Sequence, residues 1–289
     1  MSVTGWVYLD GAYMAAQDAQ ISPFDRGFLF AQAAYEVTAV YNQKLIDFEP
    51  HLKRLSRTLA GLEIEMPKED LLVVHQQLIR RNNLQEGLIY LNVSAGMQGI
   101  RDFSGPETLV PSIFAFANRK QLIGDTARDG IATISMPDTR WQRRDLKTTQ
   151  LVTQSLAYRA ARRAGAVTAI LHEDGIVTEA ASANVWIVTQ DGQLVTRDLS
   201  HALLPGITRA RLISLLQNGA DQVEERAFTL DDVRNAREVF TSSAGAMIAP
   251  VLSLDGDSIG EGQPGPVTRA IQAAYYQFIG ADLAALDWL

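Results

Sequence analysis

The chain has no cysteine. It therefore has no disulfide, no thiolate zinc site, no iron–sulfur cluster and no cysteine nucleophile. Histidine is also scarce, and no two of the four histidines have the spacing of metal ligands on a helix. They are His51, His75, His172 and His201. We therefore expect no metal site.

Basic residues are too few for a nucleic-acid-binding protein. Lys and Arg number 26 against 33 Asp and Glu, which gives a net charge of −7, whereas phosphate contacts need a basic face. No apolar run approaches the roughly 18 residues that cross a bilayer. The first residues also lack the basic, apolar pattern of a targeting segment. We expect a cytoplasmic protein whose partners are neither nucleic acids nor membranes.

The remaining composition is that of an ordinary globular protein, with 47% hydrophobic and 20% charged residues. At roughly 100–200 residues per domain, 289 residues favour two domains. A polar stretch without hydrophobic periodicity separates two halves that are richer in predicted strands and helices. We therefore predict an N-terminal domain over 1–118, a linker over 119–129 and a C-terminal domain over 130–289.

Strands and helices are mixed without regular β-α alternation, which predicts an α+β fold rather than a doubly wound sheet. Pro50 is expected to open a helix with a leucine stripe, and a second helix is expected from Pro67 to about residue 82. Strands are predicted at 35–41, 44–48, 88–95, 110–117, 130–136, 166–171, 176–178, 184–189 and 193–196. Further helices are predicted at 150–164, after 205–206, at 229–235 and at 264–279.

Lys147 is the first candidate for chemistry. It lies just before a predicted helix, in a loop that also contains Arg140, Arg143 and Arg144. A lysine near other cations loses its proton more easily and can form a Schiff base. The alternative is a solvated basic loop, which the local composition alone favours.

Three further segments have polar residues that could line a ligand pocket. Glu179 stands between two strands beside Ser182 and Asn184; the alternative is a surface turn. The run 204–209 opens a helix, whose first N–H groups can bind phosphate, although an ordinary capped helix start is commoner. Residues 241–245 are expected to form a small, hydroxyl-rich loop after a strand, of the kind that also binds phosphate. None of these signals is specific alone.

In combination, these positions resemble the class IV aminotransferases, the fold-type IV pyridoxal-phosphate (PLP) enzymes, in both order and spacing. The matching residues are Arg54, Lys147, Glu179, the Gly-Ile-Thr of 206–208 and the Thr-Ser-Ser of 241–243. Phe24-Asp-Arg-Gly-Phe resembles another segment of the family. Tyr35-Glu-Val-Thr-Ala-Val-Tyr is most similar to its D-amino-acid transaminase branch.

The resemblance covers nearly the whole chain and implies a fold, an assembly and residue roles. The fold would have a small N-terminal α/β domain and a larger C-terminal β pseudobarrel domain, with PLP in the cleft between them, and the assembly would be a homodimer. Lys147 would form the Schiff base and move the proton, and Glu179 would face the pyridine nitrogen. The other implied cofactor-binding residues are Arg54, Ser182, Asn184, Leu204, Ile207, Thr208, Ser242 and Ser243.

The substrate residues depart from the D-amino-acid pattern. That branch typically has a strand ending Thr-Arg-Gly and then an Arg-x-His trap for the α-carboxylate, whereas this chain has Ser94-Ala95-Gly96 and then Arg101-Asp102-Phe103. Arg101 matches the trap arginine only after a shift of one residue, and Phe103 stands in place of histidine. We expect Tyr35, Tyr90, Arg101 and Phe103 to contact the substrate.

These departures leave several functions open. A D-amino-acid transaminase, which moves an amino group from a D-amino acid to a 2-oxo acid, is the leading interpretation. An (R)-selective amine transaminase comes second, followed by a branched-chain L-amino-acid transaminase and an aminodeoxychorismate lyase. A non-catalytic PLP-binding scaffold is the alternative outside enzymology, although a scaffold would need neither Lys147 nor Glu179.

Overall fold

The structure is a computed structural model that describes residues 5–106, 108–217 and 223–289. The chain divides into two compact units. Unit 1 comprises residues 1–121 and 146–150, and unit 2 comprises residues 122–145 and 151–289. Each unit has its own sheet and its own hydrophobic core.

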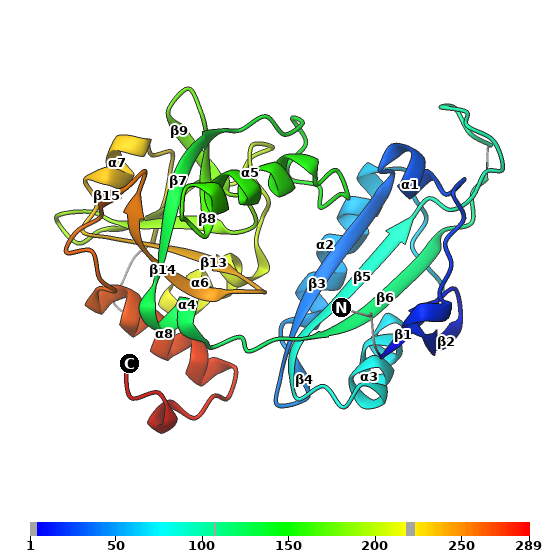
Figure 1. Ribbon diagram of the computed structural model, residues 1–289, viewed down its shortest axis with the longest axis horizontal. Helices are drawn as coiled ribbons and strands as arrows, with labels where there is room; N and C mark the ends of the chain where they lie inside the picture. Colours follow the sequence, from blue (N-terminus) through cyan, green and yellow to red (C-terminus); the bar gives the residue numbers. More distant parts are fainter. Residues whose placement is uncertain (1–4, 107, 218–222) are drawn as a thin grey trace. The chain divides into compact units, whose positions relative to one another are not determined.

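Unit 1 is built on a six-stranded antiparallel sheet in the order β2-β1-β6-β5-β3-β4 (Figure 1). The long central strands β3 and β5 pair along their whole length, with Tyr35 opposite Asn92. The strands are β1 (Trp6–Leu9), β2 (Ala12–Ala15), β3 (Ala33–Tyr41), β4 (Lys44–Leu45), β5 (Glu86–Ser94) and β6 (Ser112–Arg119).

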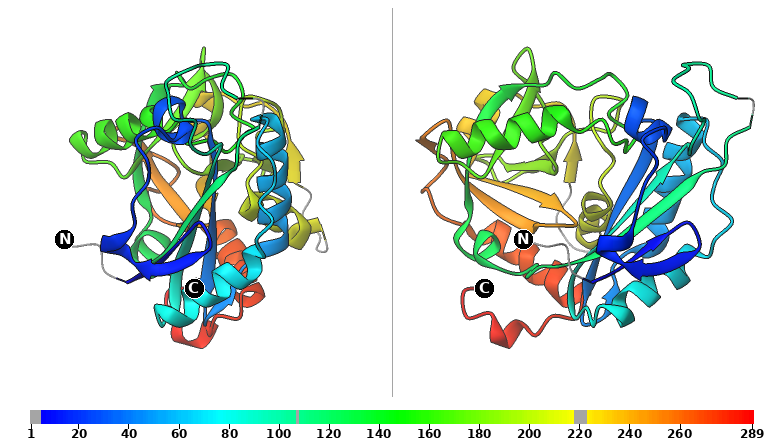
Figure 2. Two further views of the ribbon diagram at one scale, coloured as in Figure 1. Left: turned by 90° about the vertical axis from the view of Figure 1, so that its right-hand side faces the viewer. Right: turned by 45° about the vertical axis from the view of Figure 1, so that its right-hand side comes forward.

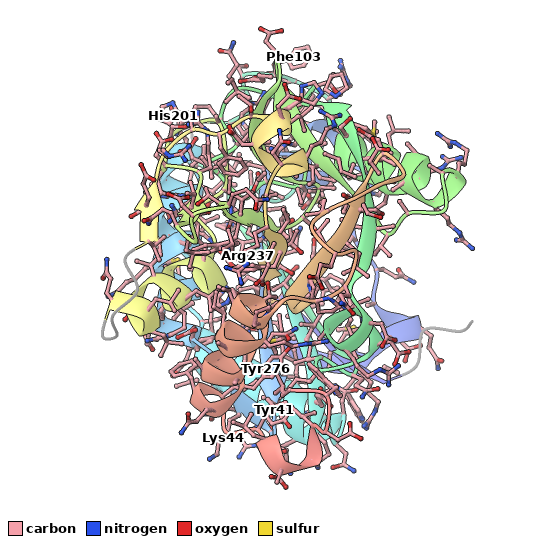
Figure 3. The ribbon with its side chains drawn as sticks, turned by 90° about the vertical axis from the view of Figure 1, so that its left-hand side faces the viewer. Tyr41, Lys44, Phe103, His201, Arg237 and Tyr276 are labelled. Atoms are coloured by element: carbon pink, nitrogen blue, oxygen red, sulfur yellow. The ribbon has the colours of Figure 1, made fainter. Side chains whose placement is uncertain are left out.

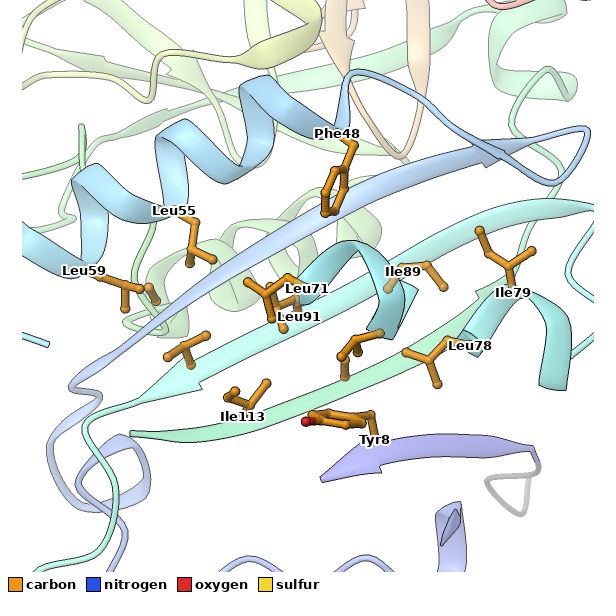
Figure 4. Close-up of a cluster of buried hydrophobic side chains, with 14 of the residues drawn as sticks. Tyr8, Phe48, Leu55, Leu59, Leu71, Leu78, Ile79, Ile89, Leu91 and Ile113 are labelled. Atoms are coloured by element: carbon orange, nitrogen blue, oxygen red, sulfur yellow. The ribbon is translucent and has the colours of Figure 1, made fainter. Parts of the chain in front are cut away.

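Two amphipathic helices, α2 (Phe48–Gly61) and α3 (Leu71–Arg81), cover one face of this sheet (Figure 2). Their apolar side chains meet those of the strands in a single cluster (Figure 4). Leu55 and Leu59 come from α2 and Leu78 from α3, whereas Ile89 and Leu91 come from β5. Unit 1 also contains the short helices η1 (Ala16–Asp18) and α1 (Arg26–Phe30).

The segment 146–150 belongs to unit 1 because it pairs with the start of β3. The amide of Tyr35 donates to the carbonyl of Lys147 over 3.0 Å, and the amide of Thr149 donates to the carbonyl of Ala33 over 3.0 Å. Backbone pairing therefore fixes Lys147 at the edge of the sheet.

Unit 2 is built on a nine-stranded mixed sheet in the order β12-β11-β10-β13-β14-β7-β8-β9, with β15 paired to β14 (Figure 1). The parallel pairs are β7–β8, β7–β14 and β11–β12. The strands are β7 (Ile131–Pro137), β8 (Thr168–Glu173), β9 (Ile176–Ala180), β10 (Asn184–Val188), β11 (Leu194–Thr196), β12 (Val223–Glu225), β13 (Glu238–Ser243), β14 (Met247–Leu254) and β15 (Asp257–Ser258).

The helices of unit 2 are α4 (Asp125–Asp129), α5 (Val152–Arg163), α6 (Ile207–Gln217), α7 (Leu230–Arg234), α8 (Pro266–Phe278) and η2 (Leu283–Ala285). Apolar residues of β8, β9, β10, β13 and β14 form the main core together with Phe228 and Val233. Within the described ranges, no helix has both the length and the apolar character needed to span a membrane.

Mixed strands and helices agree with the predicted α+β class, but several boundaries differ. Helix α2 begins at Phe48, so Pro50 is its third residue, and α3 begins at Leu71 rather than near Pro67. Asp70 explains the later start, because its carboxylate accepts from the amides of Leu72 and Val73. In place of a linker over 119–129, residues 122–129 belong to unit 2 and contain α4, whose Ala127 is fully buried.

Candidate functional site

Lys147 is held between β3 and α2 within unit 1. Its amide donates to Oγ1 of Thr58 on α2 over 3.2 Å, and its carbonyl accepts from Tyr35 on β3. Its Nζ lies 4.0 Å from the centre of the Tyr35 ring. An ammonium group over an aromatic face is a favourable cation–π contact. The two side chains that the sequence assigned to chemistry and to the substrate are therefore neighbours.

Arg54 is buried on the face of α2 that packs against β3. Its Nε and Nη2 donate to the two carboxylate oxygens of Glu36 over 2.8 and 2.7 Å, and Nδ1 of His51 lies 2.7 Å from the same carboxylate. Burial alone would raise the pKa of Glu36, but Arg54 and His51 hold it well below its usual range. Burial lowers the pKa of His51, and the nearby charge of Lys147 lowers it further.

Glu36 and His51 escaped the sequence analysis, although one signal was available. In a strand, alternate residues share a face, and Glu36 alternates with Ala34 and Thr38, which point to the buried side. A charged residue in that position requires a buried partner, and Arg54 is the partner.

Glu179 is fully enclosed in unit 2, at the end of β9. Its carboxylate accepts from Nη1 of Arg140 over 2.5 Å, from the amide of Leu204 over 3.2 Å and from Nδ2 of Asn184 over 3.4 Å. Burial raises the pKa of Glu179 above its usual range, and the Arg140 guanidinium and the Leu204 amide oppose that rise. Hydrogen bonds to a carboxylate favour its charged form, so this network prepares Glu179 to face a cation.

The loop before α6 is tied to this network. Nδ2 of Asn184 donates to the carbonyl of Leu204 over 3.0 Å. A Cβ added at Gly206 would lie 2.0 Å from Oδ1 of Asn184, so only glycine allows this approach. Ile207 and Thr208 then open α6, with Thr208 buried. Unit 2 therefore brings together Glu179, Asn184, Leu204 and the start of α6, as the sequence predicted.

The three serines predicted to bind the cofactor do not lie together. Ser242 and Ser243 end strand β13 instead of forming the predicted loop. Ser242 lies opposite Asn184 across the sheet, and its Oγ accepts from the indole of Trp186 over 2.9 Å. Ser182 is exposed and bonds to Tyr158 over 2.5 Å. The structure thus separates Ser182 from the Glu179 network, because the turn after β9 directs it toward α5.

The arginines near Lys147 in sequence are each paired with a carboxylate. Arg140 joins Asp138 to Glu179, with its Nη2 2.7 Å from Asp138. Arg143 contacts Asp145, and Arg144 contacts Glu173 over 2.7 Å. The charges of these three arginines are therefore compensated locally, and their influence on Lys147 stays a prediction. The described residues contain no group of three or more His, Asp or Glu that could hold a metal ion.

The substrate candidate Tyr90 lines a cavity of about 450 Å³ in unit 1. Tyr90 also stacks on Tyr35 at a centroid distance of 5.6 Å, which links the cavity to the ring beneath Lys147. Asp25 is the one charged residue in the lining, and its carboxylate accepts from Ser94 and Gly27. The lining is Ile21, Ser22, Pro23, Asp25, Gly27, Phe28, Ala33, Tyr90, Asn92, Ser94, Ser112, Phe114 and Thr149.

Arg101 and Phe103 lie on an exposed loop, and Phe103 (labelled in Figure 3) is 72% exposed. The Arg101 guanidinium lies 4.7 Å from the centre of the Phe103 ring and 5.6 Å from that of Phe30. Arg26, from the Phe24-Asp-Arg-Gly-Phe segment, organises this loop. Its guanidinium donates to the carbonyls of Asp102 and Phe103 over 2.8 and 2.9 Å.

Comparison with known proteins gives consistent matches. The family model described as "Amino-transferase class IV" matches residues 33–254. The chain is 32% identical over 276 residues to a D-alanine aminotransferase of Staphylococcus aureus (strain MSSA476), covering 94% of this chain and 97% of that protein. It is also 32% identical over 280 residues to the D-alanine aminotransferase of Bacillus licheniformis, covering 96% and 98%.

Solved structures match over the same extent. The branched-chain amino acid aminotransferase of Escherichia coli superimposes with a TM-score of 0.86 at 24% identity, covering 96% of this chain and 95% of that one. A putative 4-amino-4-deoxychorismate lyase from Legionella pneumophila gives a TM-score of 0.80 at 25% identity, covering 91% and 96%. These matches confirm the predicted fold.

Proposed function

Because the chain belongs to the class IV aminotransferases, we propose that it is a D-amino-acid transaminase that uses PLP. The observation that carries the proposal is the placement of Lys147, whose backbone is fixed by β3 and α2 and whose Nζ lies over Tyr35. An amine so constrained is suited to covalent attachment of an aldehyde. The relatives named D-alanine aminotransferase, aligned over nearly their whole length, support the D-amino-acid preference.

The donor chemistry of each unit, taken by itself, fits a part of PLP. In unit 1, Arg54 would bind the phosphate. In unit 2, the Ile207 and Thr208 amides and the Thr208 hydroxyl would bind phosphate, because anions bind at helix N-termini. The close approach at Gly206 keeps the start of α6 against Asn184. Glu179, oriented by three donors, would face the protonated pyridine nitrogen.

When bound, PLP supplies an aldehyde that captures an amine and a ring that withdraws electrons from the substrate's α-carbon. The protein's residues provide the rest of the chemistry. Lys147 would hold the cofactor covalently at rest and, once released, would move a proton at the α-carbon through Nζ. Arg140 and the Leu204 amide would favour the ionised form of Glu179 against the effect of burial, and a protonated ring nitrogen beside it would favour that form further. Tyr35 would orient the substrate beside Nζ.

A second candidate, an (R)-selective amine transaminase, is favoured by one specific observation. The cavity beside Tyr90 is lined by apolar and uncharged polar side chains, with Asp25 as the single charged residue among those that line it. A substrate carboxylate would find no cation there. Arg101, the predicted anchor, contacts aromatic rings on an exposed loop, and its role remains a prediction.

The test is a substrate comparison with the purified holoenzyme. D-alanine, D-glutamate, L-leucine and (R)-1-phenylethylamine are each supplied with a 2-oxo acid, and the 2-oxo acid or ketone product is measured. We expect turnover of D-alanine with a high KM, because Arg101 lacks a histidine partner. Turnover of only the amine, or of only L-leucine, would contradict the D-amino-acid proposal.

We also propose that the protein is a homodimer. Helix α1 and the loop around residue 100 in unit 1 expose large apolar side chains, including Phe28 at 75% and Ile100 at 66% exposure. Exposed apolar groups of this size commonly mark interaction surfaces. Sedimentation velocity should show a species of about twice the chain mass at micromolar concentration; a monomer throughout would contradict the assignment.

A further inference from the structure

Glu36, His51 and Arg54 form a buried polar cluster between β3 and α2. Apolar side chains could pack α2 against β3 without burying charge. Glu36 is 2% exposed, His51 4% and Arg54 8%. Replacing a buried ion pair by apolar side chains is often neutral or even stabilising, because desolvation offsets the attraction. Stability therefore gives a weak reason for the cluster, and a functional reason has to be sought.

The contacts within the cluster constrain Arg54 more than ordinary packing would. Both carboxylate oxygens of Glu36 accept from Arg54, through Nε over 2.8 Å and Nη2 over 2.7 Å. Two parallel charge-assisted bonds fix the plane of a guanidinium as well as its position. His51 holds the carboxylate in turn, with Nδ1 2.7 Å from Oε2.

The same two elements position the reactive amine. Thr58, one turn along α2 from Arg54, accepts from the amide of Lys147. Tyr35, the residue before Glu36, has its ring beneath Nζ. Strand β3 and helix α2 therefore set both the amine and the guanidinium, so a shift of Arg54 would move a phosphate ligand relative to the lysine.

We propose that Glu36 is a positioning residue for the cofactor, because it orients the guanidinium of Arg54 for the phosphate of PLP. The inference rests on the proposed function, in which Arg54 is a phosphate ligand. A guanidinium has five N–H donors in all, and Glu36 accepts from the Nε and Nη2 donors of Arg54. The alternative is that Glu36 only neutralises Arg54, and this predicts the opposite effect on phosphate affinity.

The experiment measures equilibrium binding to the apoenzyme, with PLP and with pyridoxal, which lacks the phosphate. Glu36→Gln should raise the Kd for PLP tenfold or more, the scale of one hydrogen bond to a charged group, and leave the Kd for pyridoxal within about twofold. In an Arg54→Ala background, Glu36→Gln should add little, because there is no guanidinium left to orient.

Glu238→Gln is the matched control. Glu238 is also a buried carboxylate, but it accepts from the amides of Val267 and Thr268 at the start of α8. Its loss should affect stability and leave both dissociation constants unchanged. Glu36→Asp is the second variant should Glu36→Gln fold poorly. It keeps the charge but shortens the side chain, so it should also weaken PLP binding.

Two results would overturn the inference. One is a PLP Kd for Glu36→Gln that is unchanged or lower, which would show that Glu36 merely screens Arg54. The other is Glu36→Asp binding PLP as tightly as the wild type. If Arg54→Ala itself leaves the PLP Kd unchanged, the phosphate role of Arg54 in the proposed function is wrong, and the inference fails with it.

Discussion

At the scale of single residues, the candidate site depends on how each reactive side chain is held. Lys147 has its main chain bonded on both sides, to Tyr35 and to Thr58, which leaves the side chain as its mobile part. Glu179 is the reverse case, because its carboxylate itself is held by three donors. In the proposed function, the group expected to move is thus anchored by its backbone, and the group expected to stay in place is anchored by its functional atoms.

Glu179→Gln should separate cofactor binding from proton removal. The amide keeps the shape of the side chain but loses the charge that would stabilise a protonated ring nitrogen. We expect PLP to remain bound and the rate of α-proton removal to fall very roughly 10²–10⁴-fold, since a charge in a water-poor site contributes several kcal/mol to the barrier. Stopped-flow absorbance with D-alanine measures that rate, and a near wild-type value would remove Glu179 from this role.

Arg101→Ala tests the predicted carboxylate anchor. If Arg101 binds the substrate's carboxylate, its loss should lower kcat/KM for D-alanine by about tenfold or more. The value for (R)-1-phenylethylamine, which has no carboxylate, should be preserved. Equal effects on the two substrates would show that Arg101 only supports the loop through its contacts with Phe30 and Phe103.

His75 should make stability depend on pH. It packs on Phe48, its Nδ1 donates to the carbonyl of Leu71 over 2.7 Å, and burial lowers its pKa from 6.5 to about 4. Below pH 6.5, His75 binds a proton in the unfolded chain but not in the folded state. The free energy of unfolding is therefore highest above pH 6.5 and falls as the pH drops toward 4. The full loss is about 3 kcal/mol.

Urea unfolding at pH 7, 6 and 5 measures this dependence. His75→Gln should flatten the profile, by about 2 kcal/mol between pH 7 and 5. His51, whose pKa is also lowered by burial, should account for the pH dependence of stability that remains in this variant. Parallel profiles for the variant and the wild type would show that His75 titrates normally in the folded protein.

At the scale of elements, the sequence predicted strands and helices wherever periodicity and end signals agreed. It missed the hairpin of β1 and β2, although Asp10-Gly11 is a strong turn signal and both residues have the positive φ that such a turn needs. It missed β14 because Pro250 interrupts an otherwise strand-like run, and proline is rare inside sheets. Tertiary pairing with β13 overrides that local preference.

The candidate site was predictable in part, for the same reason. Glu179, Asn184 and the start of α6 lie near one another in sequence or at recognisable ends of elements, so motif spacing could identify them. Arg140 could be identified only as a member of a basic loop. Its bond to Asp138 is local, two residues away. Its bond to Glu179 on β9 depends on tertiary folding, which no local pattern reveals.

Gly206→Ala tests the loop that leads into α6. The added Cβ would lie 2.0 Å from Oδ1 of Asn184, so either Asn184 or the helix start must move. We expect a lower melting temperature and weaker PLP binding, both measured on the purified variant. Adding Asn184→Ala removes the clashing oxygen, so the double variant should lose less than the sum of the single losses. If Gly206→Ala is as stable as the wild type, the predicted clash with Asn184 is wrong.

At the scale of the whole molecule, the chain passes from unit 1 to unit 2, returns briefly to unit 1 and then completes unit 2. Residues 146–150 belong to unit 1, although both flanking segments belong to unit 2. Composition placed one boundary near residues 119–129 and could not detect this return, because it rests on backbone pairing with β3. The return places Lys147 beside Tyr35 and Thr58 within unit 1.

Cofactor binding should stabilise the whole protein. A ligand at 100 times its Kd adds about 2.7 kcal/mol to the native state, which corresponds to a rise in melting temperature of roughly 5–10 °C for a chain of this size. Scanning calorimetry of the apoenzyme with and without PLP measures the shift. Arg54→Ala should shrink it at the same PLP concentration, and a wild-type melting temperature indifferent to PLP would contradict cofactor binding.

The central claim is that this aminotransferase acts through Lys147, and chemical trapping tests it most directly. Lys147 is the only lysine after Lys120 in the sequence, so a label in the C-terminal half has a single lysine to occupy. The holoenzyme is reduced with borohydride, digested and mapped by mass spectrometry. We predict a phosphopyridoxyl group on Lys147 and its absence from Lys147→Ala. A stoichiometric label on any other lysine, with Lys147 unmodified, would contradict it.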